Sequence, residues 1–426
     1  MRAFRLSLIV VMTFVGVAAR GDEPDWKARL AAAVSRAVAQ NPSIVEMEAR
    51  IEAARQRVEQ ADALPDTEIE VGIQDIPPSD FSFSRDDFTM EKILARQAFP
   101  AAGKRPARTR FAEAEVAATE AEHMRHVVEL AAEVADAFFA LAGVDARSRI
   151  LQASRERLRS AASAASERYR VGKGPQADVL RANLEVTSAE EKLLGIAAER
   201  RAAAARFNTL QALSSSVPVA PVELPADAPR VPGFETALAQ ALSESPGVAA
   251  AEASVRRAEE RLELARLERR PDFIATAYYA ARVDYDDFIG AFVGLSLPFL
   301  QPGRLKAREA EGEADLSGAR AGLSMARNDI EREAAEAYAE LERALEQSRL
   351  YASSILPQAE STALAAREAY VVGQVDFLTY IRSALDLDAY AAELADRRSQ
   401  AWRAAAAVQR ATGLSILPLM PEVTRE

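Results

Sequence analysis

Three segments in the first half of this chain return in the second half, in the same order and roughly 200 residues later. The matched pairs are 37–54 with 241–258, 133–141 with 333–341, and 169–185 with 370–386. The likeness is visible in the letters, since EVADAFFAL returns as EAAEAYAEL and YRVG returns as YVVG. Chance rarely produces three matches at one offset, so the sequence predicts a tandem duplication: one architecture built from two similar halves.

The composition favours long helices. Ala, Glu, Arg and Leu dominate the 426 residues, whereas Gly and Pro contribute only 18 and 20. The formal net charge of -11 argues against a nucleic-acid partner, because a polyanion would be repelled. The chain has no cysteine, which removes disulfides and thiol catalysis. No nucleophile–base set, phosphate loop or zinc motif stands out, so we expect neither an enzyme nor a cofactor.

Residues 1–21 have the pattern of a secretory signal peptide. Arg2 and Arg5 precede an apolar run at 6–17, and small residues suited to cleavage follow. The run is shorter than the roughly 20 residues that span a bilayer, which favours a cleaved signal, although an uncleaved membrane anchor stays open.

The rest of the chain divides into four parts. We expect a first repeat at 22–213, a proline-rich linker at 214–233, a second repeat at 234–413 and a C-terminal tail at 414–426. Each repeat is expected to open with an amphipathic helix, at 28–64 in the first and at 234–270 in the second. Each of these helices contains an early proline, Pro42 or Pro246, where a helix can restart.

Two strand-like runs follow the opening helix of each repeat. They lie at 67–73, 88–99, 273–281 and 288–299. Ile69, Val71 and Ile73 alternate with glutamates and a glycine, which indicates a strand with different surroundings on its two faces. At roughly ten residues the runs have the length of tilted membrane-spanning strands, but a soluble hairpin would show the same alternation.

A long helical hairpin is predicted to end each repeat. Residues 107–171 contain no proline and a single glycine, so one helix of about 95 Å is expected. A glycine turn at 171–175 and a second helix at 176–213 complete this hairpin. The second hairpin is expected at 303–370, 371–376 and 377–413, with a kink at Pro357.

Four such strands cannot close a barrel, and open strand edges are not tolerated in lipid. If the strands cross a membrane, several copies of the chain must contribute to one sheet. The helical hairpins would then continue the wall as a tube on one side of the membrane.

The order of helix, strand pair, long helix, glycine turn and helix, twice over, resembles the TolC-type outer-membrane factors of Gram-negative export systems. The most specific segments are the turns YRVGKGPQADVLRAN and YVVGQVDFLTYIRSALD, and the likeness covers essentially the whole mature chain. It implies a mainly α protein with a membrane β-barrel portion. Three copies would form a twelve-stranded barrel in outer-membrane lipid and an α-helical barrel extending into the periplasm.

The resemblance also implies partners. The turns would dock on a periplasmic adaptor coupled to an inner-membrane pump, through Val171, Gly172, Val372 and Gly373. Segment 85–108 resembles the heavy-metal branch of the family, the CusC- and CzcC-like members, which implies an RND-type pump and export of heavy-metal cations. A duct for drugs or for type I secretion is the alternative within the family.

Two aspartates beside the turns are candidate pore acids. Asp178 lies where family members often carry an acidic residue, and Asp376 lies beside the second turn. In a trimer either residue would form a ring of three carboxylates that favours cations and gates the passage. Thr379 and Arg382 stand where other members carry the constricting acids, which argues against an acidic gate in the second repeat. Both aspartates also fit the simpler role of helix caps.

His123 and His126 are the only histidines, and they lie three residues apart on a predicted helix near Glu122 and Glu129. This spacing allows both rings to face one metal ion. Exposed helix histidines without a ligand role are more common, so the two residues are weak candidates and no metal site is assigned.

Proteins of other classes also contain long helical hairpins. A periplasmic coiled-coil adaptor or structural protein is the main alternative, but the regularly spaced short strands of its lipoyl and β-barrel modules are missing here. An enzyme on a helical scaffold is disfavoured because no catalytic set is visible.

Overall fold

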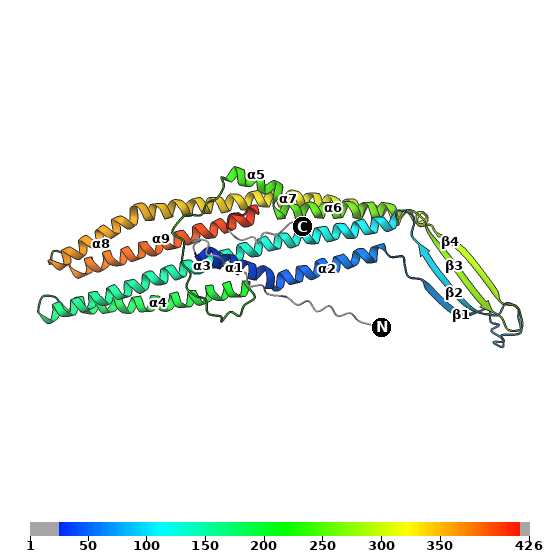
Figure 1. Ribbon diagram of the computed structural model, residues 1–426, viewed down its shortest axis with the longest axis horizontal. Helices are drawn as coiled ribbons and strands as arrows, with labels where there is room; N and C mark the ends of the chain where they lie inside the picture. Colours follow the sequence, from blue (N-terminus) through cyan, green and yellow to red (C-terminus); the bar gives the residue numbers. More distant parts are fainter. Residues whose placement is uncertain (1–24, 418–426) are drawn as a thin grey trace, which may run out of the picture.

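The computed structural model of the protein describes residues 25–417. Over this range the molecule is a long rod, with the strands at one end and two helical turns at the other (Figure 1). The expected signal peptide, residues 1–21, lies outside the described residues, and so do residues 418–426 of the expected tail.

Each half contributes two short helices, two strands and a long helical hairpin. The first half consists of α1 (Asp25–Gln40), α2 (Pro42–Asp62), β1 (Glu68–Gln74), β2 (Met90–Phe99), α3 (Lys104–Arg170) and α4 (Gln176–Leu210). The second half consists of α5 (Phe234–Glu244), α6 (Pro246–Leu267), β3 (Asp272–Ala281), β4 (Phe288–Ser296), the 3₁₀ turn η1 (Pro298–Leu300), α7 (Pro302–Leu350), the π-helix η2 (Tyr351–Ile355), α8 (Leu356–Val371) and α9 (Phe377–Thr412). The prediction of a mainly helical fold with a few antiparallel strands is confirmed.

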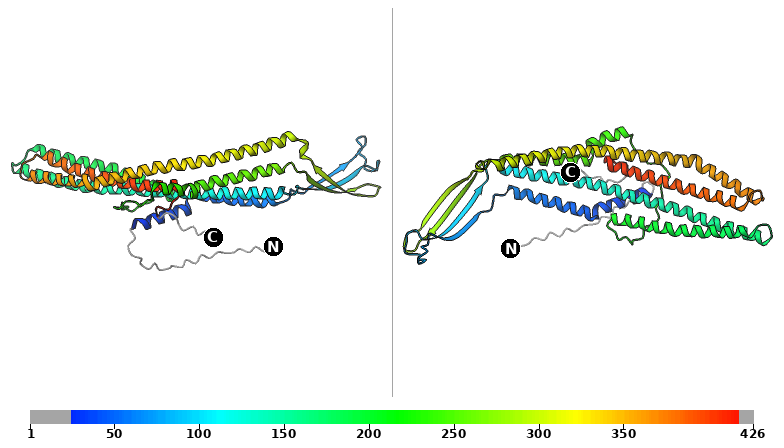
Figure 2. Two further views of the ribbon diagram at one scale, coloured as in Figure 1. Left: turned by 90° about the horizontal axis from the view of Figure 1, so that it is seen from above. Right: turned by 180° about the vertical axis from the view of Figure 1, so that it is seen from behind.

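The single opening helix expected in each half is wrong, because each is a pair of helices that meet at a proline. Asn41 and Ser245 have extended backbone and cap the second helix of their pair. Their side chains accept hydrogen bonds from the N–H groups of Ser43 (2.9 Å) and Val248 (3.2 Å). The prolines that follow sit at the first helical position, where a missing N–H leaves no partner unsatisfied. The break allows α1 to leave the axis of the rod (Figure 2).

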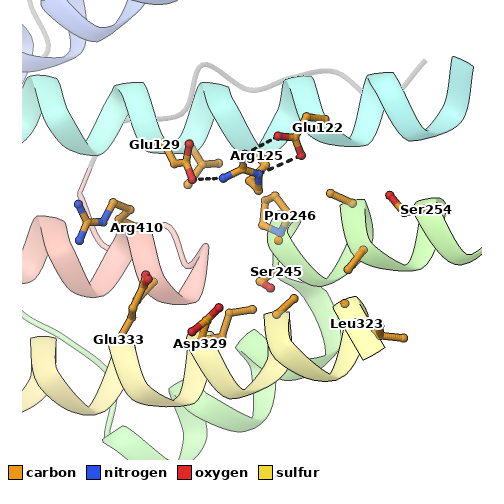
Figure 3. A pocket seen from close by; sticks show the side chains of 18 of the residues that line it. Glu122, Arg125, Glu129, Ser245, Pro246, Ser254, Leu323, Asp329, Glu333 and Arg410 are labelled. Atoms are coloured by element: carbon orange, nitrogen blue, oxygen red, sulfur yellow. Dashed lines mark hydrogen bonds and ion pairs between the residues drawn. The ribbon is translucent and has the colours of Figure 1, made fainter. Parts of the chain in front are cut away.

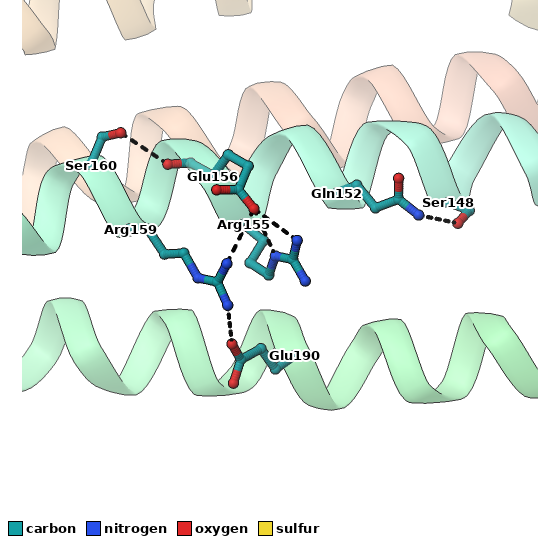
Figure 4. Close-up of polar contacts among 7 residues, drawn as sticks. All are labelled: Ser148, Gln152, Arg155, Glu156, Arg159, Ser160 and Glu190. Carbon is teal, nitrogen blue, oxygen red and sulfur yellow. Dashed lines mark hydrogen bonds and ion pairs between the residues drawn. The ribbon is translucent and has the colours of Figure 1, made fainter.

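α3 is the longest element, and its 67 residues span about 100 Å at 1.5 Å per residue. It begins three residues earlier than predicted because a proline is tolerated in its first turn. α4 packs against the part of α3 that leads to the turn, and α2 packs against the part that follows the strands. Arg159 of α3 bridges the two helices of the first hairpin, since it bonds both Glu156 on its own helix (3.3 Å) and Glu190 on α4 (2.7 Å), as Figure 4 shows.

The second long helix is interrupted where Pro357 was expected to kink it. The five-residue π-helix η2 lies immediately before α8, and Pro357 occupies the first turn of α8. A proline cannot donate to the carbonyl four residues earlier and its ring crowds that carbonyl, so a wider turn relieves the contact without ending the helix.

The main hydrophobic core lies near the middle of the rod and joins the two halves. Trp26 of α1 packs edge-on against Trp402 of α9, with ring centroids 4.9 Å apart, and Phe139 of α3 stacks on Trp402 at 5.1 Å. Phe138 and Phe139 are almost completely buried in the same cluster. Burial of these large rings ties the first helix of the chain to the last one.

The proline-rich segment 214–233 is packed against this core. Its Val222 is 1% exposed, and the N–H of Val222 donates to the buried carboxylate of Asp145 on α3 (2.8 Å). Arg200 of α4 bonds the same carboxylate (2.6 Å) and the carbonyl of Val219 (2.9 Å). We call segment 214–233 the strap, because these contacts fasten it across the first hairpin.

The strands form one antiparallel sheet in the order β1-β2-β3-β4. The central pairing, β2 with β3, joins the two halves, with Phe99 opposite Phe273 and Ile93 opposite Tyr279. At the base of the sheet, Asp272 accepts hydrogen bonds from the N–H of Ala101 (2.8 Å) and from the buried ammonium of Lys104 (2.7 Å). This clamp fixes the strands to α3.

The two faces of the sheet differ in chemistry. One row across all four strands consists of Val71, Ile93, Tyr279 and Ile289, and these side chains are between 44% and 85% exposed. The opposite face carries most of the polar side chains of the sheet, namely Glu68, Glu70, Gln74, Lys92, Arg96, Thr276 and Ser296. An apolar face that no other element of the described chain covers requires a partner outside the chain.

Apart from α1 and α5, which pack on it from outside, the helices form a single layer. The order is α2-α3-α6-α7 toward the strands and α4-α3-α9-α8 toward the turns. Each side of the rod therefore ends in unpartnered elements. We call β1, α2 and α4 the first edge, and β4, α7 and α8 the second edge.

Within residues 25–417, no helix combines the length and the apolar character needed to cross a membrane.

Candidate functional site at the hairpin turns

The first hairpin turn is closed by a Schellman motif. The N–H of Gly172 donates to the carbonyl of Tyr169 (3.0 Å), and the N–H of Lys173 donates to the carbonyl of Arg168 (2.8 Å). Gly172 has a φ of 72°, in the left-handed region that strains residues with a β-carbon. The glycine therefore ends α3 and reverses the chain.

The second turn has the same geometry. The N–H of Gly373 donates to Tyr370 (3.1 Å) and that of Gln374 to Ala369 (2.8 Å), and Gly373 has a φ of 77°. The shared YxVG pattern in the sequence thus encodes one backbone structure, used twice.

Each turn presents an apolar tip to its surroundings. Val171 is 62% exposed and Val372 is 68% exposed, and no atom lies within 4 Å of the position that a β-carbon would take on either neighbouring glycine. Both tips therefore expose an apolar side chain on sharply curved backbone.

The two turns pack against each other. The guanidinium of Arg168 in the first hairpin lies 4.8 Å from the ring centroid of Tyr370 in the second, and Tyr370 stacks on Tyr380 at 5.4 Å. Phe377 and Ile381, at the start of α9, are 1% and 2% exposed in a cluster with the alanines of α3. The ends of both hairpins therefore form one unit within a single chain.

The structure shows that Asp376 is a helix cap. Its carboxylate accepts a hydrogen bond from the N–H of Thr379 (2.8 Å) at the start of α9. Hydrogen bonds from the side chain and the N–H of Thr379 hold the pKa of Asp376 below its ordinary value, and the nearby charges of Arg181 and Arg382 lower this pKa further.

Asp178 lies in the first turn of α4 and caps no helix. Partial burial raises the pKa of its carboxyl group, and the negative charge of Asp376 raises it further, whereas Arg168 opposes both effects. The structure thus brings together the two acids that the sequence singled out, one from each turn, and gives them opposite pKa shifts.

His123 and His126 do not form part of a metal-binding group. Nδ1 of His126 lies 3.8 Å from a carboxylate oxygen of Glu129. No set of three or more potential metal ligands gathers anywhere in the described range 25–417.

A pocket of about 470 Å³ lies where α3, α6, α7 and α9 meet, and sequence reasoning did not anticipate it (Figure 3). Arg125 bridges Glu122 and Glu129 on its wall. A hydrogen bond from Arg125 lowers the pKa of Glu122. Because Arg125 is paired with both glutamates on its own helix, this part of the wall holds one positive and two negative charges and is acidic on balance.

Sequence reasoning also missed the contacts of Arg168 and Phe377. Both residues are adjacent to the recognised turn motifs, but their partners lie in the other repeat. In the sequence, Tyr370 is recognisable only as the first residue of YVVG. No local pattern predicts that its ring packs against Arg168, some 200 positions earlier.

Comparison with known proteins agrees with this architecture. The family model described as outer membrane efflux protein matches twice, at residues 33–213 and 237–414. No match was found among curated protein sequences.

Solved structures share the fold at low sequence identity. The outer-membrane channel OprN has 20% identity and a TM-score of 0.76, and the match covers 94% of this chain and 98% of that one. VceC from Vibrio cholerae has 19% identity and a TM-score of 0.74, with 91% and 96% covered. CusC has 15% identity and a TM-score of 0.75, with 91% and 92% covered.

The family matches both halves and most of the chain's length, and its members are channels rather than enzymes. They reside in the outer membrane and extend into the periplasm. The chain belongs to the outer membrane efflux protein family.

Proposed function

We propose that three copies of the chain join edge to edge into one duct, which serves as the passive outer-membrane exit of a tripartite efflux system. The observation that carries this proposal is the pair of free edges. β1 and β4 each have one unpaired side in a sheet of four strands, and lipid does not tolerate unpaired backbone groups. Pairing β1 of one copy with β4 of the next is a head-to-tail contact, and such contacts close into rings.

The two sheet faces suit a twelve-stranded barrel. The apolar face, with Val71, Val293 and Ile289 at 78% to 85% exposure, would contact lipid. The polar face, with residues such as Lys92 and Thr276, would line a water-filled interior. Purified protein in a planar bilayer would then give stable ionic currents, and a preparation without currents would contradict the duct.

The far ends of the hairpins would dock on a periplasmic adaptor, which couples to an inner-membrane pump that supplies the energy. Val171, Gly172, Val372 and Gly373 form the two exposed tips. Replacing both valines by glutamate would abolish co-purification with the adaptor and leave the trimer intact. The same change at Val217, which is exposed on the strap far from the turns, is the matched control.

Asp178 and Asp376 would act as pore acids at the narrow end of the duct. Three copies would place six carboxylates around the passage, and such rings favour cations. Asp178→Asn would lower the cation-to-anion permeability ratio of the open channel. Asp376→Asn would also weaken the cap of α9, so Asp376→Ser, which keeps a capping oxygen, separates charge from structure.

Heavy-metal cations moved by an RND-type pump are the proposed cargo. The support is the resemblance of segment 85–108 to the heavy-metal branch, together with the acids near the turns. A strain lacking the gene would lose resistance to copper, zinc or cobalt and keep resistance to drugs. Loss of drug resistance or of protein secretion alone would instead favour the other ducts of the family.

A further inference from the structure

α4 carries leucines on the side turned away from its own hairpin. Val179, Ala182, Val186 and Ala189 step by threes and fours along the face that packs on α3. At 100° per residue, Leu180, Leu184 and Leu194 lie on the opposite face, and they are 62%, 66% and 74% exposed. Among the described elements, α4 packs extensively only on α3, so this face has no partner in the chain.

The second edge carries a similar row. Leu364 of α8 is 57% exposed and Leu350 at the end of α7 is 53% exposed. Ala359, the buried residue of α8, lies about 140° around the helix from Leu364, so Leu364 points away from the α9 contact.

The two rows lie at matching heights above the turns. Both hairpins end in the same Schellman geometry, and Arg168 and Tyr370 hold the turns side by side, so distances from each turn can be compared directly. Leu184 lies about 12 Å along α4 from its first residue, and Leu364 lies about 11 Å along α8 from its last residue. Leu194 and Leu350 follow higher up, at about 27 Å and about 32 Å.

A pair of opposite charges continues the match. Arg201 of α4 and Glu346 of α7 both lie about 38 Å from their turns. Both side chains are exposed, and neither forms an ion pair with another described residue. If one edge is set against the other edge of a second copy, leucine faces leucine and arginine faces glutamate.

We propose that these two rows are the opposite sides of one seam between neighbouring copies of this chain. Leu184 of one copy packs on Leu364 of the next, Leu194 packs near Leu350, and Arg201 pairs with Glu346. The seam rests on the proposed ring of three copies and specifies which helix surfaces form it. Burial of the exposed leucines supplies the driving force, and the ion pair sets the vertical register.

The absence of native cysteine makes the seam directly testable. Leu184→Cys combined with Leu364→Cys, oxidised mildly in the intact membrane, is expected to convert most of the monomer band on a denaturing gel into covalent dimers and trimers. Either single substitution leaves the monomer band unchanged. The control pair joins Leu184→Cys to Met325→Cys, since Met325 is equally exposed at 64% but lies some 70 Å from the turns, and this pair forms no cross-link.

The native mass of the same preparations separates the possible failures. A trimer that does not cross-link, or a cross-link formed within one chain, contradicts the proposed seam but remains compatible with the proposed duct. A monomeric native mass overturns both. As an independent measurement, Leu184→Glu is expected to reduce the trimer fraction, and Leu364→Lys in the same chain restores it. Failure of that rescue also contradicts the seam.

Discussion

The guanidinium of Arg168 lies over the ring of Tyr370, 4.8 Å from its centroid, and one of its nitrogens reaches the carbonyl of the same tyrosine at 3.5 Å. This contact joins the last turn of α3 to the last turn of α8. It links the ends of the two hairpins, which are otherwise held together by the cluster around Phe377.

Arg168→Ala is therefore expected to loosen the hairpin ends. A partly exposed cation–π contact contributes about 1 kcal/mol, so the balance between packed and separated ends would shift roughly fivefold. Single-channel recordings would show a higher open probability. Arg170→Ala is the control, because Arg170 pairs only with Glu167 on its own helix. Equal effects of the two substitutions would contradict a specific role for Arg168.

The turn glycines have a separate, backbone role. Gly172→Ala and Gly373→Ala would each destabilise a turn by about 1–2 kcal/mol, because alanine is strained at a positive φ. Amide hydrogen exchange at the turns would accelerate about 5- to 30-fold. Gly195→Ala in α4 meets no atom within 4 Å and is expected to slow exchange instead, by helix propensity. Unchanged exchange in the turn variants would contradict this account.

Asp145 is expected to hold the strap. Asp145→Asn keeps the shape of the side chain but removes its negative charge. That charge strengthens the hydrogen bonds that the carboxylate accepts from Arg200 and from the N–H of Val222. The loss would be about 2–3 kcal/mol, which raises hydrogen exchange of the strap about 30- to 150-fold. Asp227→Asn, an exposed position on the same strap, is the control and should change little. A protected strap in the Asp145 variant would show that other contacts hold it.

The opposite pKa shifts of the two turn acids predict a pH dependence. When the turns are packed, the pKa of Asp178 lies above its ordinary value of 3.8. The packed turns therefore bind a proton at Asp178 more readily than separated turns would. Their stability falls as the pH rises through the range just above 3.8. The contribution of Asp376 has the opposite sign: it is present above 3.8 and lost as pH falls through its lowered pKa.

Asp178→Asn should therefore make the packed turns less sensitive to pH just above 3.8 and slightly more stable at neutral pH. Hydrogen exchange at the turns, measured between about pH 4 and pH 7 and corrected for intrinsic rates, would check this. An unchanged pH profile in the variant would rule Asp178 out as the titrating group.

Gly290 faces the ring of Tyr278 in the sheet. A β-carbon at this position would lie 2.2 Å from the ring, so Gly290→Ala must displace the tyrosine and is expected to reduce the heat stability of the assembled protein. Gly294→Ala meets ordinary contacts at 3.6 Å and should be tolerated. Tyr278→Ala should restore the stability of the Gly290 variant, and a double variant as unstable as the single would refute the steric explanation.

The sequence predicted the elements well because their signals are local. Alternation located the strands to within a few residues, and the absence of proline from 107–171 indicated a helix close to the observed α3. The sequence indicated that a helix can restart at Pro42 and Pro246, but each opening segment was still predicted as one helix. The capping side chains of Asn41 and Ser245, which separate two helices there, were not recognised.

Long-range contacts could not be predicted in the same way. Alternation does not reveal that Ile93 stands opposite Tyr279, since register depends on both strands and on the rest of the sheet. No local pattern distinguishes Asp145 from the other charged residues of its helix, and only the folded strap shows that it is buried. The contact of Arg168 with Tyr370 likewise depends on how the two repeats pack.

The central claim is that a single copy is an incomplete wall. Its most direct test is the native mass of the protein extracted from outer membranes with detergent. The account predicts three copies of the 46.1 kDa chain, less any cleaved signal, released only by detergent. A stable monomer recovered without detergent would contradict it.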